Sequence, residues 1–122
     1  MILLKRAYEA ASTKDGTRFL VERLWPRGIR KASLPLDGWL KDVAPSTELR
    51  KWFGHDPRKW TDFQRRYRAE LQHEPQFWKP LLQAARNGTI TLVYSSHDME
   101  HNNAVVLKGF LESHLAEIKK SA

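Results

Sequence analysis

Four cationic side chains lie within nine residues in the segment RLWPRGIRK, residues 23–31. Arginine binds phosphate and carboxylate groups through two parallel hydrogen bonds, which makes Arg23 and Arg27 the strongest candidates for binding an anion. The alternative is a solvated basic turn in which Arg23 pairs with a neighbouring acid such as Glu22 or Asp42. The position of the segment, directly after a predicted strand, supports a ligand site as well as it supports a solvated turn.

A second polar segment, YSSHDMEHNN at residues 94–103, runs from a predicted strand end into a predicted helix start. The free N–H groups of a helix N-terminus and the helix dipole attract anions, and a serine hydroxyl could add a hydrogen bond. Capping of the helix by Asn102 or Asn103 is expected whether or not a ligand binds. His97 and His101 are four residues apart, but no third ligand of evident geometry accompanies them, so the sequence predicts no metal site.

Two further segments combine cations with a helical pattern. Ser46 and Arg50, in PSTELRKWF at residues 45–53, could hold an anion at a helix start, although an ordinary capped amphipathic helix is the favoured alternative. The predicted basic helix at residues 58–68 could follow a phosphate backbone, although a solvated face is the more frequent role of such a helix. The alternative function is therefore a nucleic-acid-binding module, whose contact residues would be Arg30, Lys31, Arg58, Lys59, Arg65 and Arg66.

Composition restricts the function classes that remain. The 122 residues carry a formal net charge of +7, and residues 1–68 hold 16 lysines and arginines against eight acidic residues, which favours an anionic partner. The chain has no cysteine, which excludes a thiol nucleophile and favours a reducing compartment, so we expect a cytoplasmic protein. No apolar stretch approaches the roughly 18 residues of a membrane span. The common nucleotide-binding, serine-hydrolase and zinc-protease motifs are absent, so no cofactor is predicted and an enzymatic role stays open.

The hydrophobic pattern predicts one α/β domain over residues 1–122. Strands are expected at residues 2–8, 18–25 and 89–95, and the last is apolar on both faces, which favours an interior position. The loop after the first strand is too short for a parallel crossover, so the first two strands either form an antiparallel pair or are not adjacent. Predicted helices cover residues 36–43, 46–54, 57–73, 75–87 with a kink or break at Pro80, and the C-terminal segment from Asn102 or Asn103 onward.

Three long segments carry a resemblance to a known family: VERLWPRGIRK, LDGWLKDVAPSTELRKWFGHDP and ITLVYSSHDMEHNNAVVL. In this order they resemble the short, YeaO-like branch of the DUF488 family over nearly the whole chain. The resemblance implies a compact α/β domain and supplies no function. Longer members carry a D-x-R-x-x-P-x-S strand end, in the region of residues 22–26 here, and often a C-H-R segment after the last strand. This chain has His101-Asn102-Asn103 in that place, which excludes thiol chemistry.

The order of the predicted elements indicates a central, mainly parallel sheet of three to four strands flanked by helices. Ligands of such sheets bind outside the carboxyl ends of the strands, where the segments at residues 23–31 and 94–103 would meet. We therefore expect this protein to bind a phosphorylated or otherwise anionic small molecule. The expected ligand-binding residues are Arg23, Trp25, Arg27, Gly28, Ser46, Arg50, Tyr94, Ser95, His101 and Asn102.

Overall fold

Four parallel strands form the central sheet of this protein, whose structure is a computed structural model describing residues 1–121. The spatial order is β1-β4-β2-β3, and each neighbouring pair is parallel. The predicted α/β class with a mainly parallel sheet is thus confirmed. The strands are β1 (Ile2–Arg6), β2 (Thr17–Leu20), β3 (Gly38–Trp39) and β4 (Ile90–Tyr94).

β4 lies in the interior of the sheet, as its apolar sequence predicts. It pairs with β1 on one side and β2 on the other, and all five of its residues are buried. The Thr91 hydroxyl in this strand donates a hydrogen bond to the backbone oxygen of Asp15 at 2.7 Å, so this buried polar group is satisfied. Because β4 separates β1 from β2, the first two strands are not adjacent.

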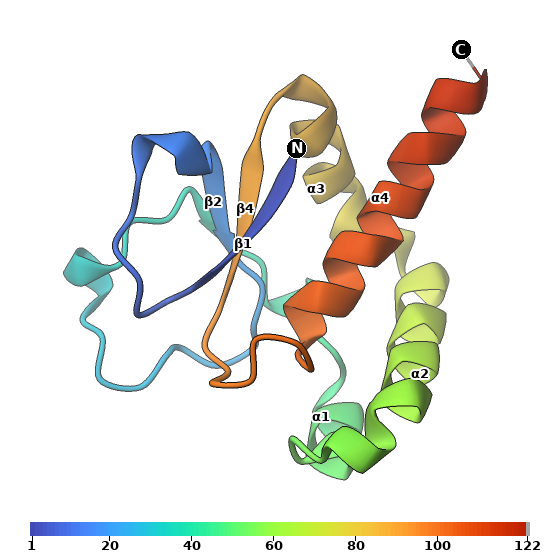
Figure 1. The fold of residues 1–122 in the computed structure, drawn as a ribbon, viewed down its shortest axis with the longest axis horizontal. Coiled ribbons are helices and arrows are strands. Elements are labelled where there is room, and N and C mark those ends of the chain that lie inside the picture. The colour runs from blue at the N-terminus through green and yellow to red at the C-terminus, as the bar shows by residue number, and fades with distance from the viewer. Residues whose placement is uncertain (122) are drawn as a thin grey trace.

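The four α-helices gather on one side of the sheet, and the loops at residues 7–16 and 21–37 cover the other side (Figure 1). The helices are α1 (Thr47–Phe53), α2 (Trp60–His73), α3 (Pro75–Asn87) and α4 (Asn103–Ser121). Four short 3₁₀ turns connect the elements: η1 (Thr13–Asp15), η2 (Lys31–Ser33), η3 (Lys41–Val43) and η4 (Pro57–Lys59).

Each face of the sheet has its own hydrophobic cluster. On the helix side, α2 buries Phe63, Tyr67 and Leu71 in one cluster with residues of α3, α4 and β4. On the loop side, a smaller cluster surrounds Leu20 and Val93. Each fully buried large apolar side chain contributes roughly 1.5–3 kcal/mol, so the helix side supplies most of the stability.

Side-chain caps fix where the helices begin. The Ser46 hydroxyl accepts a hydrogen bond from the Leu49 N–H at 3.1 Å and starts α1, which ends at Gly54 in the left-handed conformation (φ 53°). The Asn102 side chain accepts a hydrogen bond from the Val105 N–H at 3.1 Å and starts α4. Both helix starts agree with the sequence prediction.

Three predicted elements differ from the structure. Residues 36–43 are not a helix: the Asp37 carboxylate accepts the Arg18 N–H at 2.8 Å instead of capping a helix, and the segment forms β3 and η3. The second strand ends at Leu20 rather than at residue 25, because the chain then leaves β4 and turns toward the end of the sheet. α3 continues through the exposed Pro80 without a break, since proline there removes only one helical hydrogen bond.

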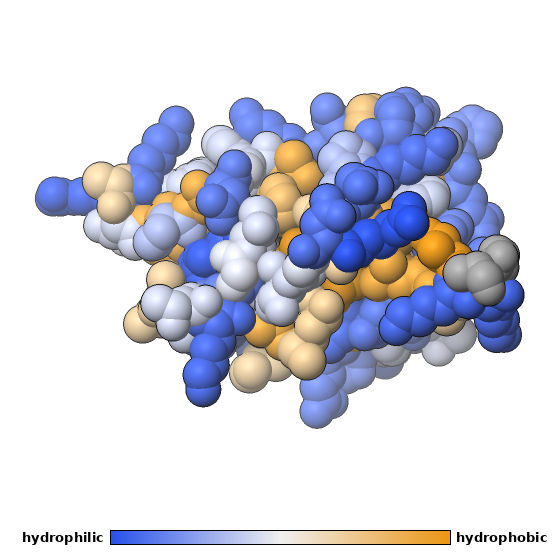
Figure 2. All heavy atoms as spheres, turned by 90° about the horizontal axis from the view of Figure 1, so that it is seen from above, coloured by the Kyte–Doolittle hydropathy of each residue, from blue (hydrophilic) through white to orange (hydrophobic). Residues whose placement is uncertain are grey.

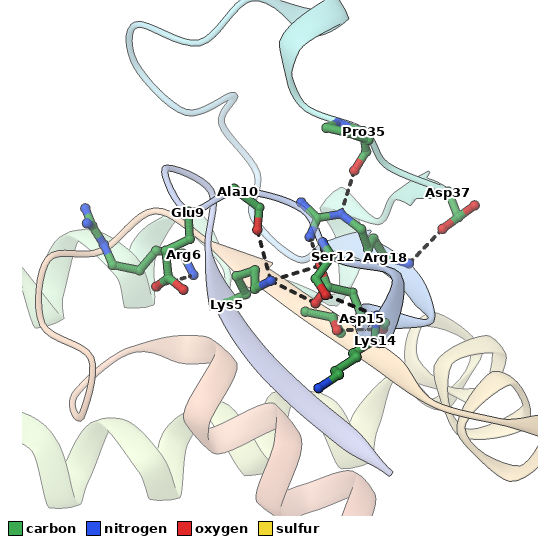
Figure 3. A network of polar contacts seen from close by, with 11 residues as sticks. Lys5, Arg6, Glu9, Ala10, Ser12, Lys14, Asp15, Arg18, Pro35 and Asp37 are labelled. Atoms are coloured by element: carbon green, nitrogen blue, oxygen red, sulfur yellow. Dashed lines mark hydrogen bonds and ion pairs between the residues drawn. The ribbon is translucent and has the colours of Figure 1, made fainter.

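A buried ion cluster ties β1, η1 and β2 together on the loop side of the sheet (Figure 3). The Asp15 carboxylate accepts hydrogen bonds from Lys5 Nζ at 2.8 Å and from Arg18 Nη1 at 2.5 Å, and also from the Ser12 N–H at 3.0 Å. The Lys5 hydrogen bond is the largest cause that lowers the pKa of Asp15, to about 2. Arg18 Nε donates to the Pro35 carbonyl at 2.8 Å, which holds the loop before β3 against the sheet.

The end of the molecule at the amino ends of the strands is mainly hydrophilic, with apolar surface gathered beside the end of α4 (Figure 2). Over residues 1–121, none of the helices combines the length and the apolar character of a bilayer-spanning segment.

Candidate functional site

A cleft of about 640 Å³ opens at the carboxyl ends of β2 and β4. The loops that follow these two strands lie side by side below the sheet, next to α1 (Figure 1). This is the position at which open parallel sheets bind their ligands. Among the expected ligand-binding residues, those that line the cleft are Arg23, Trp25, Arg27, Arg50, Ser95 and Asn102.

The three arginines of the cleft differ in how far other groups engage them. Arg23 Nε donates to the Pro45 carbonyl at 2.8 Å, and Arg23 Nη1 lies 3.7 Å from the Asp42 carboxylate. Arg23 therefore holds the segment before α1 in place, as the alternative interpretation of a pairing with Asp42 anticipated. The guanidinium groups of Arg27 and Arg50 make no hydrogen bond or ion pair with any residue from 1 to 121, and both side chains are exposed.

Glu22 places a carboxylate in the same cleft. Its Oε1 accepts a hydrogen bond from the Ser95 N–H at 2.5 Å, which joins the chain after β2 to the chain after β4. Burial raises the pKa of the Glu22 carboxyl, and the hydrogen bonds from Ser95 and the nearby His55 and Arg50 oppose that shift. Glu22 is thus a group whose charge a bound anion would influence.

Tyr8, Leu24 and Trp25 form an apolar rim of the cleft, and hydrogen bonds fix its two aromatic side chains. The Trp25 indole N–H donates to the Ile29 carbonyl at 2.6 Å, and the Tyr8 hydroxyl donates to the Arg27 carbonyl at 2.9 Å. Gly28 adopts a left-handed conformation (φ 76°) that lets the chain reverse directly after Arg27. These contacts hold the loop at residues 24–29, and with it the Arg27 backbone, against the strand ends.

The start of α4 forms the opposite wall. Asp98 accepts hydrogen bonds from the N–H groups of Glu100 and His101 at 2.9 and 3.0 Å and pairs with His101 Nδ1 at 2.9 Å. These backbone hydrogen bonds lower the pKa of the Asp98 carboxyl. The Asn103 side chain donates to the Val21 carbonyl at 2.8 Å, which fixes the start of α4 to the end of β2.

Four expected ligand-binding residues lie outside this lining. Ser46 lies in a second recess of about 500 Å³, where its hydroxyl donates to the Glu70 carboxylate at 2.5 Å. Tyr94 is buried in β4, where desolvation raises the pKa of its hydroxyl. His101 packs edge-on against Trp60, with ring centroids 5.1 Å apart. Gly28 shapes the loop beside the cleft.

The cleft also contains residues that we did not select from the sequence as ligand-binding residues. The sequence does not mark Tyr8 or Leu24 as ligand-binding residues, because a single apolar residue on the surface forms no recognisable sequence pattern. From the sequence, Glu22 is a possible partner of Arg23 and lies in the region of the family's strand-end motif, and neither feature marks it as a ligand-binding residue. His55 follows the glycine that ends α1 and is the one non-glycine residue with a positive φ (57°) among residues 1–121. Strain of this kind concentrates at functional sites, but only backbone angles reveal it.

A model of the inactive DUF488-N3 subclade matches residues 1–122. The chain belongs to this subclade of the DUF488 family. Uncharacterized protein YeaO of Escherichia coli (strain K12) is 45% identical to it over 112 residues, which span 92% of this chain and 97% of YeaO. Uncharacterized protein Rv3073c of Mycobacterium tuberculosis is 37% identical over 110 residues, 90% of this chain and 92% of that protein. No solved structure matches significantly. The YeaO-like membership predicted from the sequence is confirmed.

The basic residues proposed for nucleic-acid binding are divided in this DUF488-N3 protein. η2 lies at one side of the molecule and α2 at the other (Figure 1), so the two groups do not form one continuous surface. Arg58 pairs with Asp56 at 3.1 Å, and Lys59 and Arg66 both lie over the Trp52 ring. Binding of nucleic acid through these side chains stays a prediction. Within residues 1–121, the DUF488-N3 chain has no group of three His, Asp or Glu side chains placed to hold a metal ion.

Proposed function

We propose that this DUF488-N3 protein binds an anionic small molecule in the cleft at the carboxyl ends of β2 and β4. The observation that carries this proposal is the pair Arg27 and Arg50, whose side chains line the cleft and make no hydrogen bond or ion pair with residues 1–121. Guanidinium groups bind phosphate and carboxylate through two hydrogen bonds at once, and such charge-assisted bonds are about twice as strong as neutral ones.

The family description and the composition favour binding without catalysis. The matching subclade is described as inactive, and we propose that this chain, too, has no catalytic activity. The absence of cysteine excludes a thiol nucleophile and fits a cytoplasmic protein. Arg23 would support the site by holding the segment at residues 44–45, where it donates hydrogen bonds to two carbonyl oxygens.

Titration calorimetry with inorganic phosphate tests the proposal. Arg27→Ala should weaken phosphate binding roughly tenfold or more, because hydrogen bonds to charged groups contribute about 1.5–3 kcal/mol. Thermal unfolding should be unchanged, since the Arg27 side chain makes no internal hydrogen bond or ion pair among residues 1–121.

The matched control is Arg30→Ala, which removes another exposed arginine of the same loop, one that does not line the cleft. It should leave the affinity within about twofold, because screening weakens the interaction between exposed charges that are not in contact. Equal losses in both variants would show that phosphate senses only the net charge, and the proposed site would then be wrong.

A further inference from the structure

The cleft is larger and more apolar than the binding of a bare inorganic anion requires. Its volume of about 640 Å³ lies within the range of pockets that hold organic ligands, about 300–1,000 Å³. Its lining includes a group of apolar side chains in addition to the arginines: Leu24, Trp25, Pro26, Ala44, Pro45, Phe53 and Phe63.

Exposed large apolar side chains are concentrated at this cleft. Within residues 1–121 there are four such side chains, and two of them, Tyr8 and Leu24, line the cleft. Leu24 is 63% exposed and Tyr8 is 47% exposed. When a ligand covers an apolar side chain that is otherwise exposed to water, the free energy of the complex is lowered.

The hydrogen-bond donors of Trp25 and Tyr8 are already used within the protein, so these side chains offer a ligand mainly their rings. The Trp25 indole N–H and the Tyr8 hydroxyl are both occupied by backbone carbonyls of the same loop, at residues 29 and 27. The Arg6 guanidinium lies over the Tyr8 ring, 4.9 Å from its centroid. What these two side chains still offer is apolar ring surface in a fixed position, which lowers the entropic cost of binding an apolar group.

We propose that the ligand of this cleft is an organic anion whose aromatic or aliphatic group packs against Leu24, Trp25 and Tyr8 while its phosphate or carboxylate group binds Arg27 and Arg50. This inference rests on the proposed function and adds the chemical class of the ligand. An apolar group that covers part of the rim explains why the loop displays Leu24 to solvent beside the basic Arg27.

Calorimetry with phenyl phosphate, benzoate and inorganic phosphate tests the inference. Phenyl phosphate should bind roughly tenfold or more tightly than inorganic phosphate, because burial of one ring removes on the order of 100 Å² of apolar surface from water. Benzoate, compared with phenyl phosphate, shows which anionic group the arginines prefer.

Leu24→Ser and Met99→Ser form a matched pair of variants, since Met99 is 59% exposed and does not line the cleft. Leu24→Ser should weaken phenyl phosphate binding about three- to tenfold and leave inorganic phosphate binding unchanged. Met99→Ser should change neither affinity. Both side chains are exposed, so neither variant should unfold the protein, and thermal melts verify that.

The possible outcomes separate this inference from the proposed function. If inorganic phosphate binds and phenyl phosphate binds no more tightly, the ligand class is wrong and the anion site stands. If phenyl phosphate binds more tightly but Leu24→Ser and Met99→Ser behave alike, the apolar group does not lie at this rim and the inference is also wrong. If none of the three compounds binds, the proposed function fails, and the inference fails with it.

Discussion

Replacement of Asp15 by Asn should destabilise the fold more than any surface substitution, because the buried Asp15 carboxylate pairs with two cations, Lys5 and Arg18. Asp15 is 3% exposed, and the side chains of Lys5 and Arg18 are 18% and 6% exposed. The amide keeps the shape and an acceptor oxygen but removes the negative charge. Lys5 and Arg18 would then lie close together, shielded from water, without an anion to balance them.

The structure sets the size of this effect in two ways. Removal of one partner from a buried ion pair costs about 3–5 kcal/mol. The fall of the Asp15 pKa from 3.8 to about 2 corresponds to on the order of 2 kcal/mol for the charge alone. A domain of this size has about 5–15 kcal/mol of total stability, so a loss near 3 kcal/mol should lower Tm by roughly 10 °C.

Urea unfolding at several pH values measures both parts of the prediction. Because the folded pKa of Asp15 is depressed, its contribution is fully present above the unfolded pKa near 3.8 and is lost as the pH falls toward about 2. Asp15→Asn should therefore be less stable than the original protein at pH 7 and lose less stability between pH 4 and pH 2. The control is Lys14→Ala in the same turn, an exposed residue that should change stability by less than about 0.5 kcal/mol. If the Asp15→Asn variant were as stable as the Lys14→Ala variant at pH 7, the reasoning would be refuted.

Two further predictions concern Tyr67 and Glu22. Tyr67→Phe should lower the free energy of unfolding by about 1–3 kcal/mol, because it removes the hydrogen bond that the buried Tyr67 hydroxyl donates to the Val43 carbonyl at 2.6 Å. Urea unfolding measures this loss, and an unchanged unfolding midpoint would contradict the prediction. Phosphate affinity should fall as the pH rises through the raised pKa of Glu22, because the ionised carboxylate repels the anion. Glu22→Gln should flatten that pH dependence in calorimetry, and a profile as steep as that of the original protein would count against Glu22.

Local sequence signals predicted the elements whose ends are set by capping residues or by burial on both faces. Ser46 and Asn102 start α1 and α4 through hydrogen bonds within their own first turns, so nearby sequence was sufficient. The run at residues 90–94 is apolar on both faces, and such a strand can be stable only between two others. The cleft opens at the edge of the sheet that the sequence indicates, because the carboxyl ends of parallel strands lie at one edge.

Contacts between distant segments decided the rest. Residues 36–43 carry an amphipathic pattern, but backbone hydrogen bonds between Leu20 and Leu40 and between Arg18 and Asp37 make the segment an edge strand instead of a helix. Local propensity is worth only tenths of a kcal/mol per residue, so such pairing overrides it.

Contacts between distant segments also decided which residues line the cleft. Glu22 became a site residue because its carboxylate accepts a hydrogen bond from Ser95, 73 residues later in the chain. Ser46 does not line the cleft, because its hydroxyl donates a hydrogen bond to the Glu70 carboxylate on α2. Sequence patterns alone were sufficient for the fold class, for most of the helix starts and for the edge of the sheet at which the cleft opens. Which side chains face one another across that edge was decided only by the packing of α4 against β1 and β4 and of α2 against α4, since side-chain direction depends on partners that are remote in the sequence.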